Sequence, residues 1–337
     1  MNKLLQSITN VLTYTYSKES HKTVVNLGYG IDDNCCRCTG ASIASFCINN
    51  PKINFTFHIL GSNLSNISKD NFKKLAQSYS SNIIIHEIDT SYLNSIKLPT
   101  KTGLPLPTYF RFILPLILKD LDKIFYIDSD IICRNSAEEL FNISLGDNII
   151  GAVEENDERI RNWCNELNIP HHKYFNAGML AINVPKWNEY NIFDKLIDIV
   201  PKNHDKFPFL DQDALNFILT GKILYLKDKF NCQNWCYWKT HDSKNIASDD
   251  ISVIHFGSYP KPWGLAWPSS EYYNSFNASI YSSYEALTPW KDYPLEKPKY
   301  YKEMKRYAKY LLKKGHIAQS IKWYINYSIK KISKKIQ

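Results

Sequence analysis

The feature that most constrains the fold is a regular alternation of apolar runs and helical patterns in the first third of the chain. Three runs have the length of a strand, and two intervening segments repeat apolar residues at intervals of three and four, as on a helix face. The strand-like runs are 21–30, 53–60 and 82–89, and the helical segments are 39–50 and 68–80. Because strands separated by helices favour crossover connections, this alternation predicts an α/β fold with a doubly wound, mostly parallel sheet.

The middle of the chain continues this pattern towards an acidic motif. A predicted helix over 108–120 leads into the apolar run KIFYI, which ends abruptly at Asp128-Ser129-Asp130. Further strands are expected around 148–153, in 176–184 and over 251–256, and further helices from Trp187 to Val200 and after Asp211. In open α/β sheets ligands bind at the carboxyl ends of the strands, so the acidic motif marks a predicted site.

Positive charge is concentrated at the C-terminal end of the chain. The net charge is +8, but residues 297–337 alone carry +12 and the remainder carries −4. A mildly acidic body argues against nucleic acid as a partner, whereas a basic tail with aromatic residues favours an anionic membrane surface. We therefore divide the chain into an N-terminal extension at 1–20, a principal domain at 21–267 and a linker with basic helices at 268–337.

The basic tail contains two predicted helices, at about 299–314 and 317–333. The second carries apolar residues among its lysines: Ile317, Ile321, Trp323, Tyr324, Tyr327, Ile329 and Ile332. Such a helix can lie in a membrane interface, with lysine ammonium groups at lipid phosphates and apolar side chains towards the acyl chains. Packing of the helix pair on the principal domain is an equally good interpretation.

Membrane spans, export signals and structural zinc receive no support from the sequence. No segment approaches the roughly 20 apolar residues that a spanning helix requires, and residues 1–20 lack a signal-peptide pattern. The eight cysteines include a cluster at 35, 36 and 38 and a pair at 232 and 236, but neither spacing fits a zinc ribbon. We expect free thiols and a cytoplasmic protein.

Asp128, Asp130 and His255 are candidate ligands of one divalent cation. Two carboxylates at positions i and i+2 on a strand end point the same way, and His255 follows another predicted strand. A shell of carboxylates and imidazole suits Mn²⁺ at least as well as Mg²⁺. The alternatives are a solvated turn or helix cap for the aspartates and a structural role for the histidine.

Other polar residues follow predicted strands or begin predicted helices. The segment Gly30–Asn34 lies where a nucleotide base and ribose would rest, although it can equally cap the next helix. Lys261 is placed to neutralise a phosphate. Asp211 and Gln212 begin a helix and offer a carboxylate and an amide that can orient a sugar and stabilise positive charge at its anomeric carbon, while capping is the alternative role for Asp211.

Six motifs in a fixed order resemble the retaining glycosyltransferases of family 8, especially bacterial lipopolysaccharide core glucosyl- and galactosyltransferases. The motifs are GIDDN, YFRF, YIDSD, YFNAGMLAIN, LDQDALN and HFGSYPKPW. The resemblance covers about residues 23–267, and the tail is similar to the basic extension of these core enzymes. It implies a single Rossmann-like, nucleotide-sugar-binding domain of the GT-A type.

The resemblance also implies roles for individual residues. Asp32 and Asn34, with Gly30, match uridine contacts, Arg111 a donor contact, and Asp128, Asp130 and His255 the metal ligands, with Ser129 between the aspartates. Asn176, Ala177, Asp211 and Gln212 match the positions that hold the transferred hexose, with Asp211 and Gln212 as the catalytic candidates. Lys261 matches the diphosphate lysine, and Glu155 an acceptor-side carboxylate. One departure is that Gly257 comes a residue early and Ser258 stands where the family carries glycine.

The predicted activity is transfer of glucose or galactose from a UDP-hexose to a lipopolysaccharide core acceptor, with retention and with Mn²⁺ or Mg²⁺ as cofactor. The alternatives are a metal-dependent phosphohydrolase, whose apolar strand also ends in D-x-D, and a non-catalytic UDP-sugar-binding protein at the membrane. We expect the protein on the cytoplasmic face of the bacterial inner membrane.

Overall fold

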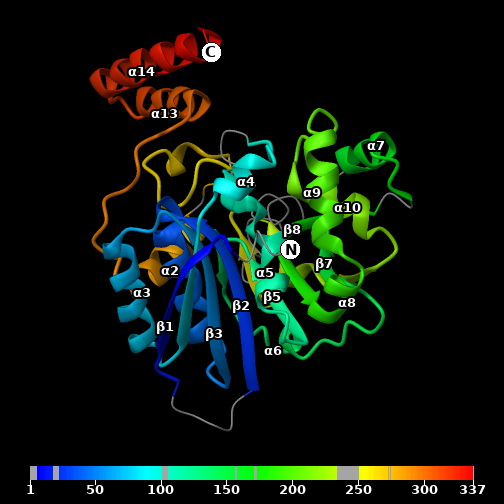
Figure 1. Ribbon diagram of the computed structural model, residues 1–337. Coiled ribbons are helices and arrows are strands. Elements are labelled where there is room, and N and C mark those ends of the chain that lie inside the picture. The colour runs from blue at the N-terminus through cyan, green and yellow to red at the C-terminus, as the bar shows by residue number, and fades with distance from the viewer. Residues whose placement is uncertain are drawn as a thin grey trace.

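A mixed sheet of eight strands forms the centre of the computed structural model, which describes residues 6–17, 23–100, 105–155, 158–170, 173–233, 250–271, 273 and 275–336 (Figure 1). The strand order is β1-β4-β3-β2-β5-β8-β7-β9. The bounds are β1 Ile8–Thr15, β2 Thr23–Asp32, β3 Ile53–Ser62, β4 Asn82–Ile88, β5 Lys123–Ile127, β7 Ile150–Glu154, β8 Phe175–Asn183 and β9 Ile223–Leu226. Strands β4, β3, β2 and β5 run parallel, and β7 is parallel to β9. The predicted α/β class and mostly parallel sheet are confirmed.

Two antiparallel strands depart from the simple alternation. β8 lies between β5 and β7 and is antiparallel to both. β1 pairs antiparallel with β4, in a register that includes Leu12 opposite Ile85 and Tyr14 opposite Ile83. Residues 8–15, which we expected in an N-terminal extension, are therefore an edge strand of the sheet. Polar residues alternate with apolar ones along this strand because only one of its faces is covered.

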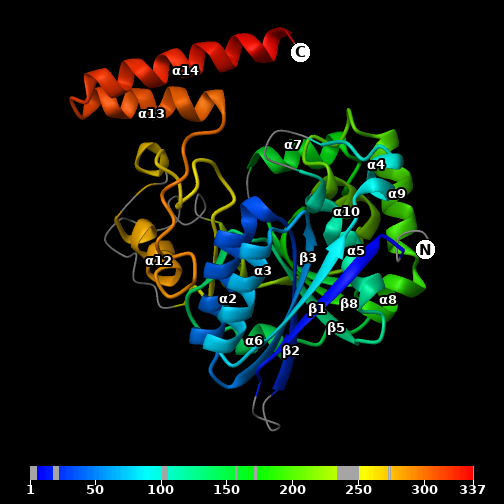
Figure 2. The same cartoon turned by 60° about the vertical axis from the view of Figure 1, so that its left-hand side comes forward.

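Helices cover both faces of the sheet, as the two views show (Figures 1 and 2). The bounds are α2 Cys36–Asn49, α3 Asn66–Ser78, α4 Ser91–Ser95, α5 Phe110–Ile117, α6 Glu138–Phe141, α7 Glu158–Glu166, α8 Val184–Glu189, α9 Ile192–Lys202, α10 Asp211–Leu219 and α12 Ser275–Glu285. The helix expected from Trp187 to Val200 is two helices, α8 and α9. They are separated at Asn191, whose φ of 50° is left-handed and ends the first helix.

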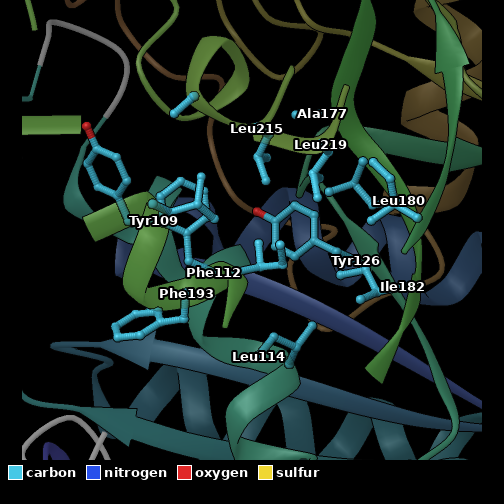
Figure 3. Packing of buried hydrophobic residues seen from close by; sticks show 14 of the residues in the cluster. Tyr109, Phe112, Leu114, Tyr126, Ala177, Leu180, Ile182, Phe193, Leu215 and Leu219 are labelled. Carbon is cyan, nitrogen blue, oxygen red and sulfur yellow. The ribbon is translucent and has the colours of Figure 1, made fainter. Parts of the chain in front are cut away.

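Apolar side chains fill the space between the sheet and each helical layer. Neighbouring β8 residues alternate between the two layers, so that Leu180 and Ile182 face one cluster and Met179 and Ala181 the other. Figure 3 shows the first cluster, in which Tyr126 of β5 lies among residues of β8, α5 and α10. This packing fixes the end of β5, where the acidic motif begins.

A second, three-stranded sheet carries His255. It consists of β10 (Cys232–Gln233), β11 (Val253–His255) and β6 (Ile131–Cys133), with β11 in the middle. The strand predicted over 251–256 is thus present but shorter, and it does not join the central sheet. Its antiparallel register pairs His255 with Ile131, directly after the acidic motif.

The C-terminal region packs against α2 and ends in a helical hairpin. A buried ion pair joins Arg37 of α2 to Glu285 of α12, and a Cβ atom at Gly40 would lie 2.5 Å from the ring of Trp290. The hairpin consists of α13 (Tyr301–Lys313) and α14 (Ile317–Ile336), which lie side by side at one end of the molecule (Figures 1 and 2). None of the described helices is both long enough and apolar enough to cross a bilayer.

Candidate active site

The side chains of Asp128, Asp130 and His255 meet at the carboxyl end of β5. The His255 Nε2 atom lies 3.3 Å from Asp130 Oδ1 and 3.8 Å from Asp128 Oδ2. Backbone pairing sets this geometry, because Phe256 N donates to Asp130 O at 3.0 Å and Asp128 N donates to Gly178 O at 2.7 Å. The three residues predicted as metal ligands from distant parts of the chain therefore form one cluster.

This cluster has the composition and spacing of a site for a divalent cation. One ligand atom from each of the three residues lies within 4.8 Å of the others. Carboxylate oxygens and an imidazole nitrogen suit Mn²⁺ or Mg²⁺. The residues present therefore fit such an ion. The seven cysteines among the described residues are free, and Cys236 lies outside the described residues.

Two cations, the buried Arg111 and the partly buried Lys261, lie beside the aspartates. Arg111 on α5 donates to Asp128 Oδ1 at 2.8 Å and contacts Asp211 Oδ2 at 3.1 Å, while the Lys261 ammonium group lies 2.5 Å from Asp130 Oδ2. Arg111 is held by Ala177 O at 2.6 Å, and its guanidinium carbon lies 4.5 Å from the ring centre of Tyr126. The site thus combines acidic ligands with fixed positive charges that can meet an anionic substrate.

Burial and neighbouring charges shift the pKa values of two aspartates in opposite directions. Burial acts to raise the pKa of Asp130, but Lys261 and His255 hold it well below its usual value. Burial raises the pKa of Asp211 to about 7, although the charge of Arg111 acts against this shift. Asp130 is therefore ionised at neutral pH, whereas Asp211 gains or loses its proton close to neutral pH.

A cavity of about 510 Å³ opens over this cluster. Of the residues predicted for the site, those lining it are Gly30, Asp32, Arg111, Asp128, Ser129, Asp130, Glu155, Asn176, Asp211, Gln212, His255 and Lys261. Asn34 instead lines an adjoining cavity of about 340 Å³, which shares Asp32 and Lys261 with the first. Ala177 is buried behind the wall, where its backbone N–H donates to Gln212. The structure brings the predicted residues together in one region.

The segment after β2 also makes the capping contacts that were its alternative interpretation. Asp32 caps the short helical turn Asp33–Cys35 by accepting from Asn34 N at 3.0 Å, and Asp33 accepts from Ser65 N at 2.9 Å. These hydrogen bonds fix the segment, and Asp32 nevertheless lines the cavity. Capping and ligand contact are compatible at this position.

Family profiles match nearly the whole of this architecture. The profile of glycosyl transferase family 8 matches residues 26–266, and the profile of the family 8 C-terminal region matches residues 267–331. The chain belongs to glycosyltransferase family 8. The resemblance noted in the six motifs is thereby confirmed, and the protein is a glycosyltransferase rather than a phosphohydrolase.

Several relatives in the family share most of this chain. A lipopolysaccharide 1,3-galactosyltransferase of Salmonella typhimurium is 30% identical, with 96% of each chain covered. The lipopolysaccharide glucosyltransferase WaaO of Escherichia coli is 29% identical, again with 96% of each chain covered. Both hexoses thus occur in the names of proteins with similar overall sequence.

Solved structures show the same fold. The galactosyltransferase LgtC, in complex with donor and acceptor sugar analogs, aligns with a TM-score of 0.66 at 23% identity over 79% of this chain and 96% of LgtC. The glycosyltransferase GlyE of Streptococcus pneumoniae gives 0.58 at 21% identity over 80% of this chain and 62% of GlyE. The GT-A type fold expected for a family 8 enzyme is confirmed.

Gln212 lines the same cavity as Lys261, and four hydrogen bonds hold its side chain in one orientation. Its carbonyl oxygen accepts from Ala177 N at 3.0 Å and from Asn176 Nδ2 at 3.2 Å. Its amide nitrogen donates to Tyr174 Oη at 3.2 Å and to Glu155 Oε2 at 3.3 Å. Gln212 therefore contacts both Asn176, another residue expected at the hexose, and Glu155, the residue expected at the acceptor.

Three residues at the site were not singled out in the sequence, although two stand inside recognised motifs. A Cβ atom at Gly178 would lie 2.3 Å from His255 Cε1 and 2.9 Å from Asp128 Oδ2, so only glycine allows these ligands to approach. Tyr126 donates to Asp128 Oδ1 at 3.0 Å. Asn231, which belongs to none of the motifs, accepts from His255 Nδ1 at 3.1 Å.

The loop with the unusual glycine position lies over the same cavity. Gly257 and Ser258 both line it, next to Tyr259 and Lys261. The Lys261 ammonium group donates to Phe256 O at 2.7 Å and lies 4.6 Å from the ring centre of Tyr259. The departure at Ser258 thus leaves the contact between Lys261 and Asp130 in place.

Proposed function

We propose that this family 8 enzyme is a metal-dependent, retaining hexosyltransferase that transfers glucose or galactose from a UDP-hexose to a lipopolysaccharide core oligosaccharide. The observation that carries the proposal is the convergence of Asp128, Asp130 and His255 with Lys261 at a cavity that Gln212 also lines. The names of the similar enzymes from Salmonella typhimurium and Escherichia coli support both the donor class and the acceptor class.

In this proposal the cavity binds the donor in an extended arrangement. Asp32 and Asn34 hold the uridine, Lys261 and Arg111 meet the diphosphate, and Asn176, Asp211 and Gln212 hold the hexose. Asp128, Asp130 and His255 hold Mn²⁺ or Mg²⁺, which supplies positive charge to the diphosphate when it is bound. The distribution of charge supports this arrangement, because Arg111 and Lys261 lie beside the carboxylates and the amides of Asn176 and Gln212 line the same cavity.

Transfer breaks the bond between the anomeric carbon and the phosphate oxygen of UDP. The hydroxyl oxygen of the acceptor forms the new bond, and its proton is released. Retention follows either from attack on the face that UDP leaves or from two displacements with Gln212 or Asp211 as the nucleophile. Glu155 is proposed to orient the acceptor, and its contact with Gln212 supports a position near the reacting carbon.

The metal cluster provides the test of this function. Asp130→Ala and His255→Ala should each lower transfer by at least about 100-fold in the presence of Mn²⁺, because each removes a predicted ligand. Asp198→Ala, which removes an exposed carboxylate on α9, is the matched control and should retain full activity. Mass spectrometry with a truncated core oligosaccharide and each UDP-hexose measures transfer and identifies the donor. Full activity of both ligand variants would contradict the proposal.

We also propose that the enzyme binds the cytoplasmic face of the bacterial inner membrane through α14. Five isoleucines on one face of this helix are each more than half exposed: Ile317, Ile321, Ile325, Ile329 and Ile332. We call them the isoleucine face. Trp323 instead packs on Tyr307 of α13, so part of the expected apolar surface closes the hairpin. The charge of +12 over residues 297–337 supports an anionic lipid surface as the partner.

A further inference from the structure

A buried chain of amide groups connects His255 to Gln212. Asn231 and His255 are only 3% and 4% exposed, so hydrogen-bonding groups in this region require partners within the protein. Asn231 lies between the short helical turn Asp228–Phe230 and β10, and β10 pairs with β11 so that Gln233 faces His255. This pairing brings Asn231 beside the imidazole from the side opposite the two aspartates.

Backbone N–H groups determine which way two of these amides point. Gly178 N donates to Asn176 Oδ1 at 3.0 Å, and Ala177 N donates to Gln212 Oε1 at 3.0 Å. A backbone N–H can only donate, so the atom that it contacts in each amide must be the oxygen. Asn176 Nδ2 consequently donates to Gln212 Oε1, at 3.2 Å.

The orientation of Asn231 follows from that of Asn176. Asn176 Oδ1 is an acceptor, so the Asn231 atom 2.9 Å from it must be the donor Nδ2. The Asn231 oxygen therefore faces His255 Nδ1 at 3.1 Å and accepts a hydrogen bond from the Nδ1–H group. Because Asn231 holds Nδ1, Nε2 is the ring nitrogen that faces Asp128 and Asp130.

We propose that Asn231 is a positioning residue that fixes His255 as an Nε2 ligand and joins the metal ligands to the amides that hold the donor sugar. The inference rests on the proposed function, because it presumes that a cation and a UDP-hexose occupy the two ends of the chain. Partners of this kind set the tautomer and ring orientation of metal-binding histidines. The amide oxygen of Asn231 contacts His255, and its amide nitrogen donates to Asn176.

Three substitutions separate the two contacts of Asn231. Asn231→Ala removes both, Asn231→Asp keeps the acceptor for His255 but loses the donor to Asn176, and Asn176→Ala breaks the chain on the sugar side only. Asn50→Ala is the matched control, because Asn50 is a fully buried amide that contacts Phe46 O and Ala137 N away from the cavity. Thermal unfolding of each variant shows whether its fold is retained.

Mn²⁺ affinity in the presence of UDP, measured by electron paramagnetic resonance, is the principal readout. We expect Asn231→Ala to bind Mn²⁺ about 10- to 100-fold more weakly, which is the usual effect of losing a partner of a ligating histidine. Asn231→Asp and Asn176→Ala should bind Mn²⁺ as tightly as the unchanged protein but show a lower kcat. Asn50→Ala should lose thermal stability and keep its Mn²⁺ affinity.

The histidine tautomer gives a second measurement that does not depend on any variant folding. In the full chain loaded with Mg²⁺ and UDP, ¹⁵N NMR should show His255 protonated at Nδ1. Protonation at Nε2, or unchanged Mn²⁺ affinity in a folded Asn231→Ala protein, would overturn the inference and leave the proposed function standing. Failure of the unchanged protein to bind Mn²⁺ and UDP would overturn the proposed function and this inference with it.

Discussion

Single residues at the site carry roles that the sequence only partly reveals. Asp128 and Asp130 could be predicted because their charges stand out at the end of an apolar strand, and Lys261 because it follows soon after another. The role of Gly178 could not be predicted from charge or strand position. It depends on close packing, because a Cβ atom at this residue would lie only 2.3 Å from His255 Cε1. Asn231 gave no signal, because an asparagine after a short turn has no distinctive neighbours in the sequence. Its contacts arise only when β10 and β11 pair.

A buried pair of histidines outside the active site should make the stability of the fold depend on pH. His58 on β3 and His86 on β4 lie 3.3 Å apart, and His58 Nε2 contacts Asn26 Oδ1 at 3.0 Å. Burial lowers the pKa of His58 to about 3, with His86 contributing, and burial lowers the pKa of His86 to about 4. Between about pH 4 and 6.5 the folded state therefore binds fewer protons than the unfolded chain.

The free energy of unfolding should consequently fall as the pH drops below about 6.5. Each histidine contributes a slope of up to about 1.4 kcal/mol per pH unit until the pH approaches its folded pKa. Urea unfolding between pH 7.5 and 5.5 measures this slope. The double variant His58→Gln and His86→Gln should show a shallower dependence on pH, and equal slopes in the two proteins would show that neither histidine is held neutral by the fold.

At the scale of elements, helices and strands that pack on their neighbours in sequence were predicted, whereas those that depend on distant contacts were missed. The β2–α2–β3–α3–β4 succession could be predicted because each element is amphipathic or apolar over its own length and neighbours in sequence pack together. β1 was missed because its partner, β4, lies more than 65 residues away and half of its side chains are polar. The break at Asn191 was missed because no proline or glycine marks it.

The loop that carries Lys261 is held by the segment that begins the hairpin. Leu265 N donates to Glu296 O and Glu296 N donates to Trp263 O, both at 2.9 Å. Arg306 of α13 donates to Tyr259 O at 3.1 Å. The ring of Tyr300 stands edge-on to that of Tyr259, with centres 5.0 Å apart.

Loss of these contacts should weaken donor binding. Tyr300→Ala and Arg306→Ala are each expected to reduce UDP affinity about 3- to 10-fold, which corresponds to one modest hydrogen bond or ring contact. Lys309→Ala removes a positive charge from the same helix without a contact to the loop and is the control. Calorimetric titration with UDP and Mn²⁺ measures the affinities, and equal values in all four proteins would show that the loop does not depend on the hairpin.

At the scale of the whole molecule, the isoleucine face predicts attachment to lipid. Ile321→Glu, Ile325→Glu and Ile329→Glu together should abolish most binding to liposomes that contain anionic lipid, because each places a carboxylate where an apolar side chain would be buried. Ile67→Glu on α3 is the matched control, since Ile67 is 66% exposed but lies outside this face. Sedimentation with liposomes measures binding, and retention of the triple variant would favour packing of α14 on protein.

The contact between Arg306 and the carbonyl of Tyr259 ties the hairpin to the loop that lines the cavity. A tilt or shift of α13 would strain or break its hydrogen bond to the loop whose Lys261 ammonium group reaches Asp130. A bilayer that sets the orientation of α14 would therefore also influence the position of that loop. The rate of sugar transfer is then expected to respond to lipid composition, even for an acceptor that is freely dissolved.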